Sequence, residues 1–144
     1  MKYKDRVVSY PVAKLMSDKQ INLLQREGFE DPDETLMYGL NSQTGQYELH
    51  RMDFMFDDKR FKNTDPWYYA PTQTMLARFL REEKNILIEI LIDKTTEPAY
   101  VFSIWKYEDF GNWTEVEDPE GKWLLFRNYE EALNEALLIM LRVI

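Results

Sequence analysis

Residues 86–92 constrain the fold of this chain more than any other segment, because apolar side chains occupy both sides of an extended backbone there. Four isoleucines at alternate positions would line one face of a strand, while two leucines flank a glutamate on the other: Ile86, Ile88, Ile90, Ile92, Leu87, Leu91 and Glu89. Strands that are apolar on both faces are typical of sheets with both faces covered. We therefore expect an interior strand that is packed on both sides.

The C-terminal segment shows the most regular periodicity of the chain. Apolar residues recur at helical spacing over residues 129–144, and Asn128 precedes them as a suitable N-cap. Leu138, Ile139 and Val143 make the end of this helix apolar nearly all round. Such an end is either deeply buried or part of a subunit contact. These three residues are therefore candidates for an interaction surface, and a homodimer through this helix is one expectation.

The N-terminal segment has two helix signals. Ser9 is a plausible N-cap with Pro11 in the first turn, where the missing proline N–H costs nothing. Ser17 and Gln20 then match a capping box, and Gly28 is a natural end of a helix. We expect either two short helices or one helix with a break at Ser17.

The remaining segments predict strands and one more helix. Residues 35–40 and 46–54 form an expected hairpin around a Gly-containing loop, and residues 56–67 an expected surface loop. A central helix should begin at Pro71-Thr72 and end at Asn85, followed by further extended segments at 100–107, 113–116 and 123–126. This order predicts an α+β fold, with an antiparallel sheet packed by an N-terminal, a central and a C-terminal helix, in a single domain over residues 1–144.

Charge and composition exclude several classes of protein. The net charge is −8, and the Lys and Arg residues are scattered among acids, which disfavours direct binding to nucleic acid or to an anionic membrane. No stretch approaches the ~20 apolar residues of a membrane span, and the N-terminus shows no apolar signal segment. The chain has no cysteine, which favours a reducing compartment. We therefore expect a cytoplasmic protein.

A search for reactive groups finds no catalytic set. His50 is the only histidine, there is no cysteine nucleophile or Gly-x-Ser-x-Gly motif, and the five glycines form no phosphate loop. Acidic clusters at residues 30–34, 53–58 and 115–120 do not match a calcium loop. We expect no catalytic residue, cofactor or metal site. If the three clusters lay on one face, the chain would instead be an acidic mimic of nucleic acid that inhibits a host DNA-binding protein.

Aromatic residues are the most unusual feature, at 15% of the chain. Trp67, Tyr68 and Tyr69 stand together in an expected loop before the central helix, and are the best candidates for an exposed patch that binds a protein or a flat ligand. The alternative is that aromatic residues fill the core. A further alternative is a small-molecule binder or an enzyme with a pocket near Trp67, Tyr69 and His50.

Several stretches of residues 66–144 are similar to a known group of proteins. They are Tyr69-Ala70-Pro71-Thr72-Gln73, Phe79-Leu80-Arg81-Glu82-Glu83-Lys84-Asn85 running into Ile86-Leu87-Ile88-Glu89-Ile90, and Tyr129-Glu130-Glu131-Ala132-Leu133. The chain resembles small uncharacterised proteins of bacteriophages and prophages, and its layout is similar to the phage helix–sheet–helix sandwich family. The resemblance implies an accessory role in a mobile element and brings no catalytic residues. Together with the missing catalytic set, it predicts a non-enzymatic protein that binds another protein.

Overall fold

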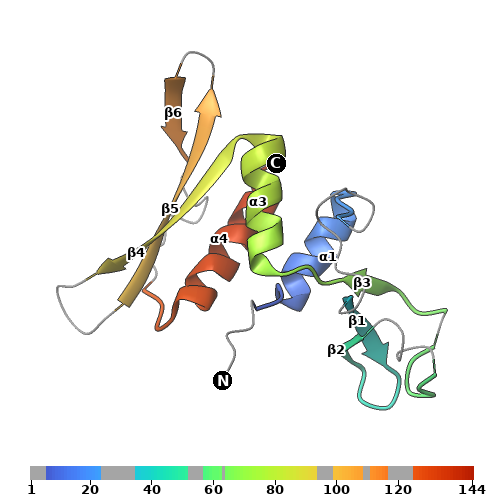
Figure 1. Ribbon diagram of the computed structural model, residues 1–144. Coiled ribbons are helices and arrows are strands. Elements are labelled where there is room, and N and C mark those ends of the chain that lie inside the picture. Colours follow the sequence, from blue (N-terminus) through green and yellow to red (C-terminus); the bar gives the residue numbers. More distant parts are fainter. Residues whose placement is uncertain are drawn as a thin grey trace. The chain divides into compact units, whose positions relative to one another are not determined.

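Antiparallel strands with helices beside them make up both parts of the chain that can be described (Figure 1). The structure, a computed structural model, describes residues 6–23, 35–51, 57–62, 64–93, 99–108, 111–116 and 125–144. Within these residues the chain forms two compact units, one of residues 7–72 and one of residues 73–144 with Arg6. The expected α+β class is confirmed, but the described strands form two three-stranded sheets in place of one.

Helix α1 (Tyr10–Asp18) of the first unit begins as the sequence predicts, with Ser9 at the N-cap and Pro11 in the first turn. The expected capping box at Ser17 is wrong, because this residue lies inside the helix and the following residues end it. Gln20 has a φ of 59°, and the backbone N–H groups of Gln20 and Ile21 donate to the carbonyls of Ser17 and Met16. These two bonds define a Schellman C-cap, so Ser17 precedes a helix end. Gly28 lies outside the described residues.

The hairpin of the first unit joins β1 (Leu36–Asn41) to β2 (Gln46–Arg51), with Asn41 opposite Gln46. Its loop is ordered by the buried Asn41 side chain, whose Oδ1 accepts from the backbone N–H groups of Gln43 and Thr44. The loop then returns through Gly45, whose φ of 73° is the left-handed conformation that glycine adopts without strain. The expected hairpin is confirmed within the described residues, where its second strand reaches Arg51.

A third strand, β3 (Trp67–Tyr69), completes the sheet in the order β2-β1-β3. Tyr68 lies opposite Tyr38 in the antiparallel register. The expectation of a loop up to Trp67 is therefore wrong for this strand. It is also wrong for Phe61, which is buried and forms a β-bridge with Asn41. Aromatic residues of both segments contribute to the sheet and its packing. Both segments are too short to show the alternating pattern from which a strand is predicted.

The two ends of residues 7–72 lie side by side. Val7 and Thr72 form an antiparallel β-bridge, and the N–H of Val8 donates to the carbonyl of Pro71 at 2.9 Å. The first unit is therefore inserted in the sequence of the second, and its first and last residues, Val7 and Thr72, are neighbours in space.

The second unit contains α3 (Gln73–Lys84), β4 (Ile86–Asp93), β5 (Ala99–Glu108), β6 (Asn112–Glu115) and α4 (Tyr129–Val143). Asn85 ends α3 in the left-handed conformation, with a φ of 56°, as its position in the sequence predicts. Asn128 caps α4 by accepting from the N–H of Glu131 at 2.9 Å, which is also as predicted.

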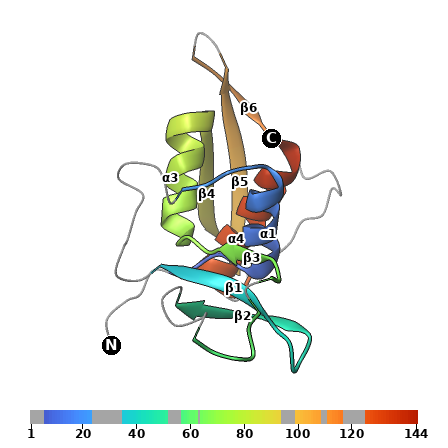
Figure 2. The ribbon, with the colours of Figure 1, turned by 90° about the vertical axis from the view of Figure 1, so that its right-hand side faces the viewer.

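Strands β4, β5 and β6 form an antiparallel sheet in that order, and α3 and α4 lie on one side of β4 and β5 (Figure 2). The buried Ile86 and Ile104 stand on the helix side, since Ile104 pairs with Ile88, two residues along from Ile86. The expectation of an interior, fully covered strand is wrong for β4. In the described sheet β4 is an edge strand, and Leu91 and Ile92 are half exposed. Of the predicted strand at 123–126, residues 123 and 124 lie outside the description, while Phe126 bridges to Tyr100.

Candidate functional site

A pocket of about 360 Å³ opens in the first unit between the C-terminal end of α1 and strand β3. It brings together all three residues of the predicted aromatic patch. Its lining consists of Ala13, Met16, Ser17, Gln20, Ile21, Asn22, Trp67, Tyr68 and Tyr69. The predicted patch is thus one wall of a concavity, and the end of a helix supplies the other wall.

The Schellman C-cap of α1 builds the helical wall. Because Gln20 adopts the left-handed conformation, the chain reverses sharply and places Ile21 next to the last turn of the helix. A Schellman cap commonly carries an apolar contact between the residue after the turn and the last helical turn, here Ile21 and Met16. Both residues line the pocket. Sequence reasoning missed them because the spacing of Ser17 and Gln20 suggested a helix start.

The aromatic wall is held by sheet pairing and by a cluster of tyrosine rings. Tyr10 stacks on Tyr47 with ring centroids 4.4 Å apart, and Tyr68 lies within 6 Å of both rings. Tyr38, opposite Tyr68 in the sheet, contacts Tyr10 edge-on and donates its hydroxyl to the carbonyl of Val8 at 2.7 Å. Ring pairs of this kind are worth about 0.5–1.5 kcal/mol beyond their buried area. Ring packing with Tyr10 and Tyr47 and strand pairing with β1 therefore hold Tyr68, the middle residue of β3, in place.

The tyrosine cluster is an environment that disfavours charge. Burial raises the pKa of Tyr38 above its ordinary value of 10.0. Burial also raises the pKa of Tyr47, and the neighbouring Tyr68 and Tyr10 raise it further. Both phenols are consequently neutral at physiological pH, where they act as hydrogen-bonding and packing groups.

The chemistry of the pocket is neutral and mixed. None of the nine lining residues carries an ionisable carboxyl, amino, guanidinium or imidazole group. Ser17, Gln20 and Asn22 supply hydrogen-bonding groups at one wall, while Trp67, which is 40% exposed, contributes an indole to the other. Such a pocket suits an uncharged, largely apolar group with one or two hydrogen-bonding atoms. The titratable side chains of this lining are the phenols of Tyr68 and Tyr69.

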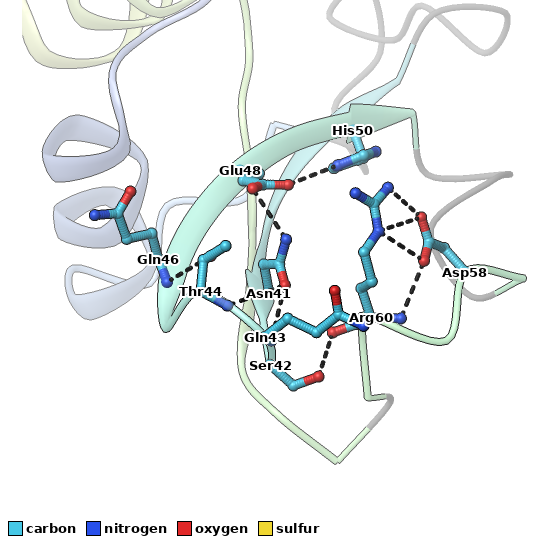
Figure 3. A network of polar contacts seen from close by, with 9 residues as sticks. All are labelled: Asn41, Ser42, Gln43, Thr44, Gln46, Glu48, His50, Asp58 and Arg60. Atoms are coloured by element: carbon cyan, nitrogen blue, oxygen red, sulfur yellow. Dashed lines mark hydrogen bonds and ion pairs between the residues drawn. The ribbon is translucent and has the colours of Figure 1, made fainter.

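His50, which we considered together with Trp67 and Tyr69, does not line this pocket. Its Nε2 lies 3.4 Å from Glu48 Oε2 (Figure 3). Its ring packs edge-on against Phe61, with ring centroids 4.4 Å apart. Glu48 also accepts a hydrogen bond from the Asn41 amide at 3.0 Å. These contacts stabilise the hairpin and leave the imidazole half buried beside an aromatic ring. The role that they indicate for His50 is structural.

Asp58 and Arg60 form the ion pair with the shortest distance among the described residues, 2.6 Å. The Arg60 guanidinium donates from Nε to both carboxylate oxygens and from Nη2 at 2.6 Å, and its backbone N–H donates at 3.0 Å (Figure 3). The side-chain and then the backbone hydrogen bonds from Arg60 lower the pKa of Asp58 from 3.8 to about 2. The Arg60 carbonyl in turn accepts from the N–H and the hydroxyl of Ser42. The pair thereby holds residues 57–62 against the hairpin loop.

The other predicted surface lies on α4. Ile139 is buried, Leu138 is half buried, and Val143 is 44% exposed. The structure thus gives the three residues different environments: the apolar end of α4 contributes Ile139 to the core and presents Val143 to solvent. They do not form one continuous exposed group, and a two-copy contact through α4 stays a prediction.

Most of the acidic residues considered as a nucleic-acid mimic lie outside the described chain. Of the three clusters, Asp57, Asp58 and Glu115 are described, and Asp58 is paired with Arg60. Among the described residues no group of His, Cys, Asp or Glu is arranged to hold a metal ion. Within the same residues no helix has the length and apolar character needed to cross a membrane.

Comparison with known proteins adds no relative to this description. No protein-family model matches the chain, and no curated protein or solved structure is significantly similar to it.

Proposed function

We propose that this protein is not an enzyme and acts by binding another protein, with the pocket between α1 and β3 receiving an apolar side chain of that partner. The observation that carries the proposal is the pocket lining: three consecutive aromatic residues face a methionine and an isoleucine, with no charged group between them. Pockets of this kind receive the few anchor residues that dominate the free energy of many protein interfaces.

The exposure of the aromatic wall supports this reading. Trp67 is 40% exposed although it belongs to a strand, so its indole retains apolar area that a partner can cover. Burial of apolar area contributes roughly 25 cal/mol per Å², so covering one large side chain contributes about 1.5–3 kcal/mol. The ring contacts of Tyr68 with Tyr10 and Tyr47 hold this wall in place, which lowers the entropic cost of binding.

A small neutral ligand is the second candidate for the same pocket. The volume of about 360 Å³ lies at the lower end of the roughly 300–1,000 Å³ range of small-molecule sites. Ser17, Gln20 and Asn22 would then fix the orientation of the ligand. A ligand of this class would bind the isolated protein, whereas a protein anchor requires the partner. Titration of small neutral compounds into the isolated protein therefore distinguishes the two candidates, because only the small-ligand candidate predicts binding.

The biological setting is also a proposal. The resemblance to small phage and prophage proteins supports an accessory role in a mobile element, with a host or phage protein as the partner. The absence of cysteine from the sequence fits action in a reducing compartment such as the cytoplasm.

The test is to fill the pocket without disturbing the core. Ser17 is exposed and lines the pocket, so Ser17→Trp places an indole in the cavity. Lys14→Trp is the matched control, since Lys14 is exposed on the same helix and does not line the pocket. We expect affinity capture from the native host to recover a partner with the wild type and with Lys14→Trp, and to lose it with Ser17→Trp. Recovery of the same partner by all three proteins would refute the pocket as the binding site.

A further inference from the structure

The sheet of the second unit has an outer face that neither helix of this unit, α3 or α4, covers. Side chains alternate across a strand, so the residues that pair with one another share a face. From Leu87 to Leu91 of β4, from Val101 to Tyr107 of β5 and from Trp113 to Glu115 of β6, the side opposite the helices carries Leu87, Glu89, Leu91, Val101, Ser103, Trp105, Tyr107, Trp113 and Glu115. We call these nine residues the outer sheet face.

The outer sheet face is apolar and aromatic in composition, although none of its residues is buried. Leu91 is 51% exposed, Trp113 is 50% exposed and Tyr107 is 38% exposed. A sheet that is apolar on both faces is typical of folds in which helices cover both sides. In the described part of this unit both helices, α3 and α4, lie on one side of the sheet, so the other side is suited to cover by a further element.

The aromatic end of this face is ordered before any partner arrives. Tyr107 and Trp113 pack edge to face with ring centroids 5.2 Å apart, and the Tyr107 hydroxyl accepts from the Gly111 N–H at 3.1 Å. The Trp105 indole donates to the Ser103 hydroxyl at 3.3 Å. Rings that are already held in place lose little conformational freedom on binding. The face is therefore preorganised for contact.

Charge specifies the partner further. The outer sheet face carries two carboxylates, Glu89 and Glu115, and no Lys or Arg among its nine residues. Glu115 lies directly opposite Trp105, and Trp113 is two residues away on the same strand. An arginine that approaches this end can pair with the carboxylate while its guanidinium stacks on an aromatic ring. A second copy of the same face would instead bring carboxylates against carboxylates.

We propose that the outer sheet face binds an amphipathic helix of another protein, whose apolar stripe is flanked by Arg or Lys residues. Such a helix would lie across β4 and β5 and give the sheet its second helical layer. This site is separate from the pocket of residues 7–72, so it stands or falls independently of the function proposed above.

The probe is a synthetic 16-residue amphipathic helix with Leu and Phe at i, i+3, i+4 and i+7 and Arg on both flanks. We expect saturable binding by calorimetry, and backbone NMR shifts concentrated at the nine residues of the outer sheet face. A peptide of the same composition in scrambled order, and one with Glu flanks, should bind at least about tenfold more weakly, which corresponds to about 1.4 kcal/mol.

Two substitutions on exposed residues test the contacts without removing core. Trp113→Ala should weaken binding about tenfold or more, as expected for an aromatic anchor. Glu115→Lys should weaken it by a factor that shrinks at high salt, because added salt screens the repulsion. Glu108→Lys is the control, since Glu108 pairs with Asn112 on the helix side of the sheet and should leave binding unchanged.

Five outcomes would overturn the proposal, and four of them concern the peptide and the face itself. These are no binding of the Arg-flanked helix, equal binding of the scrambled peptide, binding that survives Trp113→Ala and Glu115→Lys together, and NMR contacts showing that other segments of this same chain cover the face. A wild-type dimer in sedimentation velocity that Trp113→Ala dissociates would also overturn it, because the occupant would then be a second copy. Ser17→Trp should leave helix binding unchanged, so failure of the pocket and failure of this face are distinguishable.

Discussion

The side chain of Asp58 accepts three hydrogen bonds from the Arg60 guanidinium and one from the Arg60 backbone N–H, although only one residue separates the two. The pair leaves the Asp58 pKa at about 2, below its ordinary 3.8. A carboxyl whose folded pKa is depressed stabilises the fold above its unfolded pKa, and this contribution is lost as pH falls through the folded value.

The first prediction concerns this titration. In carboxyl-detected NMR, Asp58 should titrate near pH 2 in the wild type and move towards 3.8 in Arg60→Gln, where most of its donors are removed. The stabilisation from the pair should accordingly disappear between about pH 4 and pH 2. An Asp58 that titrates near its ordinary value in the wild type would show that the pair does not form in solution.

The second prediction concerns Asn41, which is buried and orders the hairpin loop. Asn41→Ala removes the acceptor for Gln43 and Thr44 and the donor to Glu48, and leaves a buried loop end unsatisfied. We expect the free energy of unfolding, measured in urea, to fall by about 1–3 kcal/mol. Ser42→Ala, which removes one exposed hydroxyl, should cost much less. Equal losses for both variants would contradict the role given to Asn41.

The third prediction concerns the end of α1. Gln20 is a non-glycine residue at a φ of 59°, where a side chain costs free energy that glycine does not. Gln20→Gly should therefore raise the free energy of unfolding by about 1 kcal/mol. Lys19→Gly is the matched control, because Lys19 has a φ of −88° and glycine gains no conformational advantage there. If both substitutions destabilise alike, α1 does not end in a Schellman cap at Gln20.

The fourth prediction concerns alkaline pH. Because burial raises the pKa of the Tyr38 phenol in the folded state, folding favours the protonated form, so stability is present below about pH 10 and falls as pH rises above it. Tyr38→Phe should lose about 1 kcal/mol at pH 7, through the lost bond to Val8, but should show a shallower decline between pH 9 and pH 11. The measurement is the free energy of unfolding in urea at each pH. An equal decline for the wild type and Tyr38→Phe would contradict the role given to the Tyr38 phenol.

The fifth prediction separates the two sides of α4. Leu137 is fully buried and Val143 is 44% exposed. Leu137→Ala should reduce the free energy of unfolding by about 2–5 kcal/mol, whereas Val143→Ala should change it by less than about 0.5 kcal/mol. A large loss at Val143 at high protein concentration only would instead indicate that α4 takes part in an association between copies.

The parts of the fold that could be predicted are those in which local chemistry and burial agree. The α4 helix, its Asn128 cap and the α3 end at Asn85 follow from periodicity and from residues that tolerate the required backbone. The β3 strand could not be predicted in this way. It has three residues and is defined by its pairing with β1, which is a long-range contact without a local signal.

The candidate site was predicted in part. The aromatic run at 67–69 indicated one wall of the pocket, because three consecutive large aromatic residues are unusual in a segment expected to be a loop. The opposite wall depends on how α1 ends. Ser17 and Gln20 fit both a helix start and a helix end, and only the backbone conformation at Gln20 decides between them. The interior position expected for β4 was wrong, because apolar residues on both faces indicate that both faces can be covered but do not show where the strand lies in a sheet.

The β-bridge between Val7 and Thr72 has a consequence for how this chain can be taken apart. A segment whose first and last residues are adjacent can be inserted into a loop of another protein, because no long linker is needed to connect its two ends to that protein. Residues 7–72 satisfy this condition. The pocket-bearing segment is thus a candidate cassette for transplantation, and the flanking sequence can be rejoined through a short connection between Arg6 and Gln73, whose backbones already share a hydrogen bond of 2.8 Å.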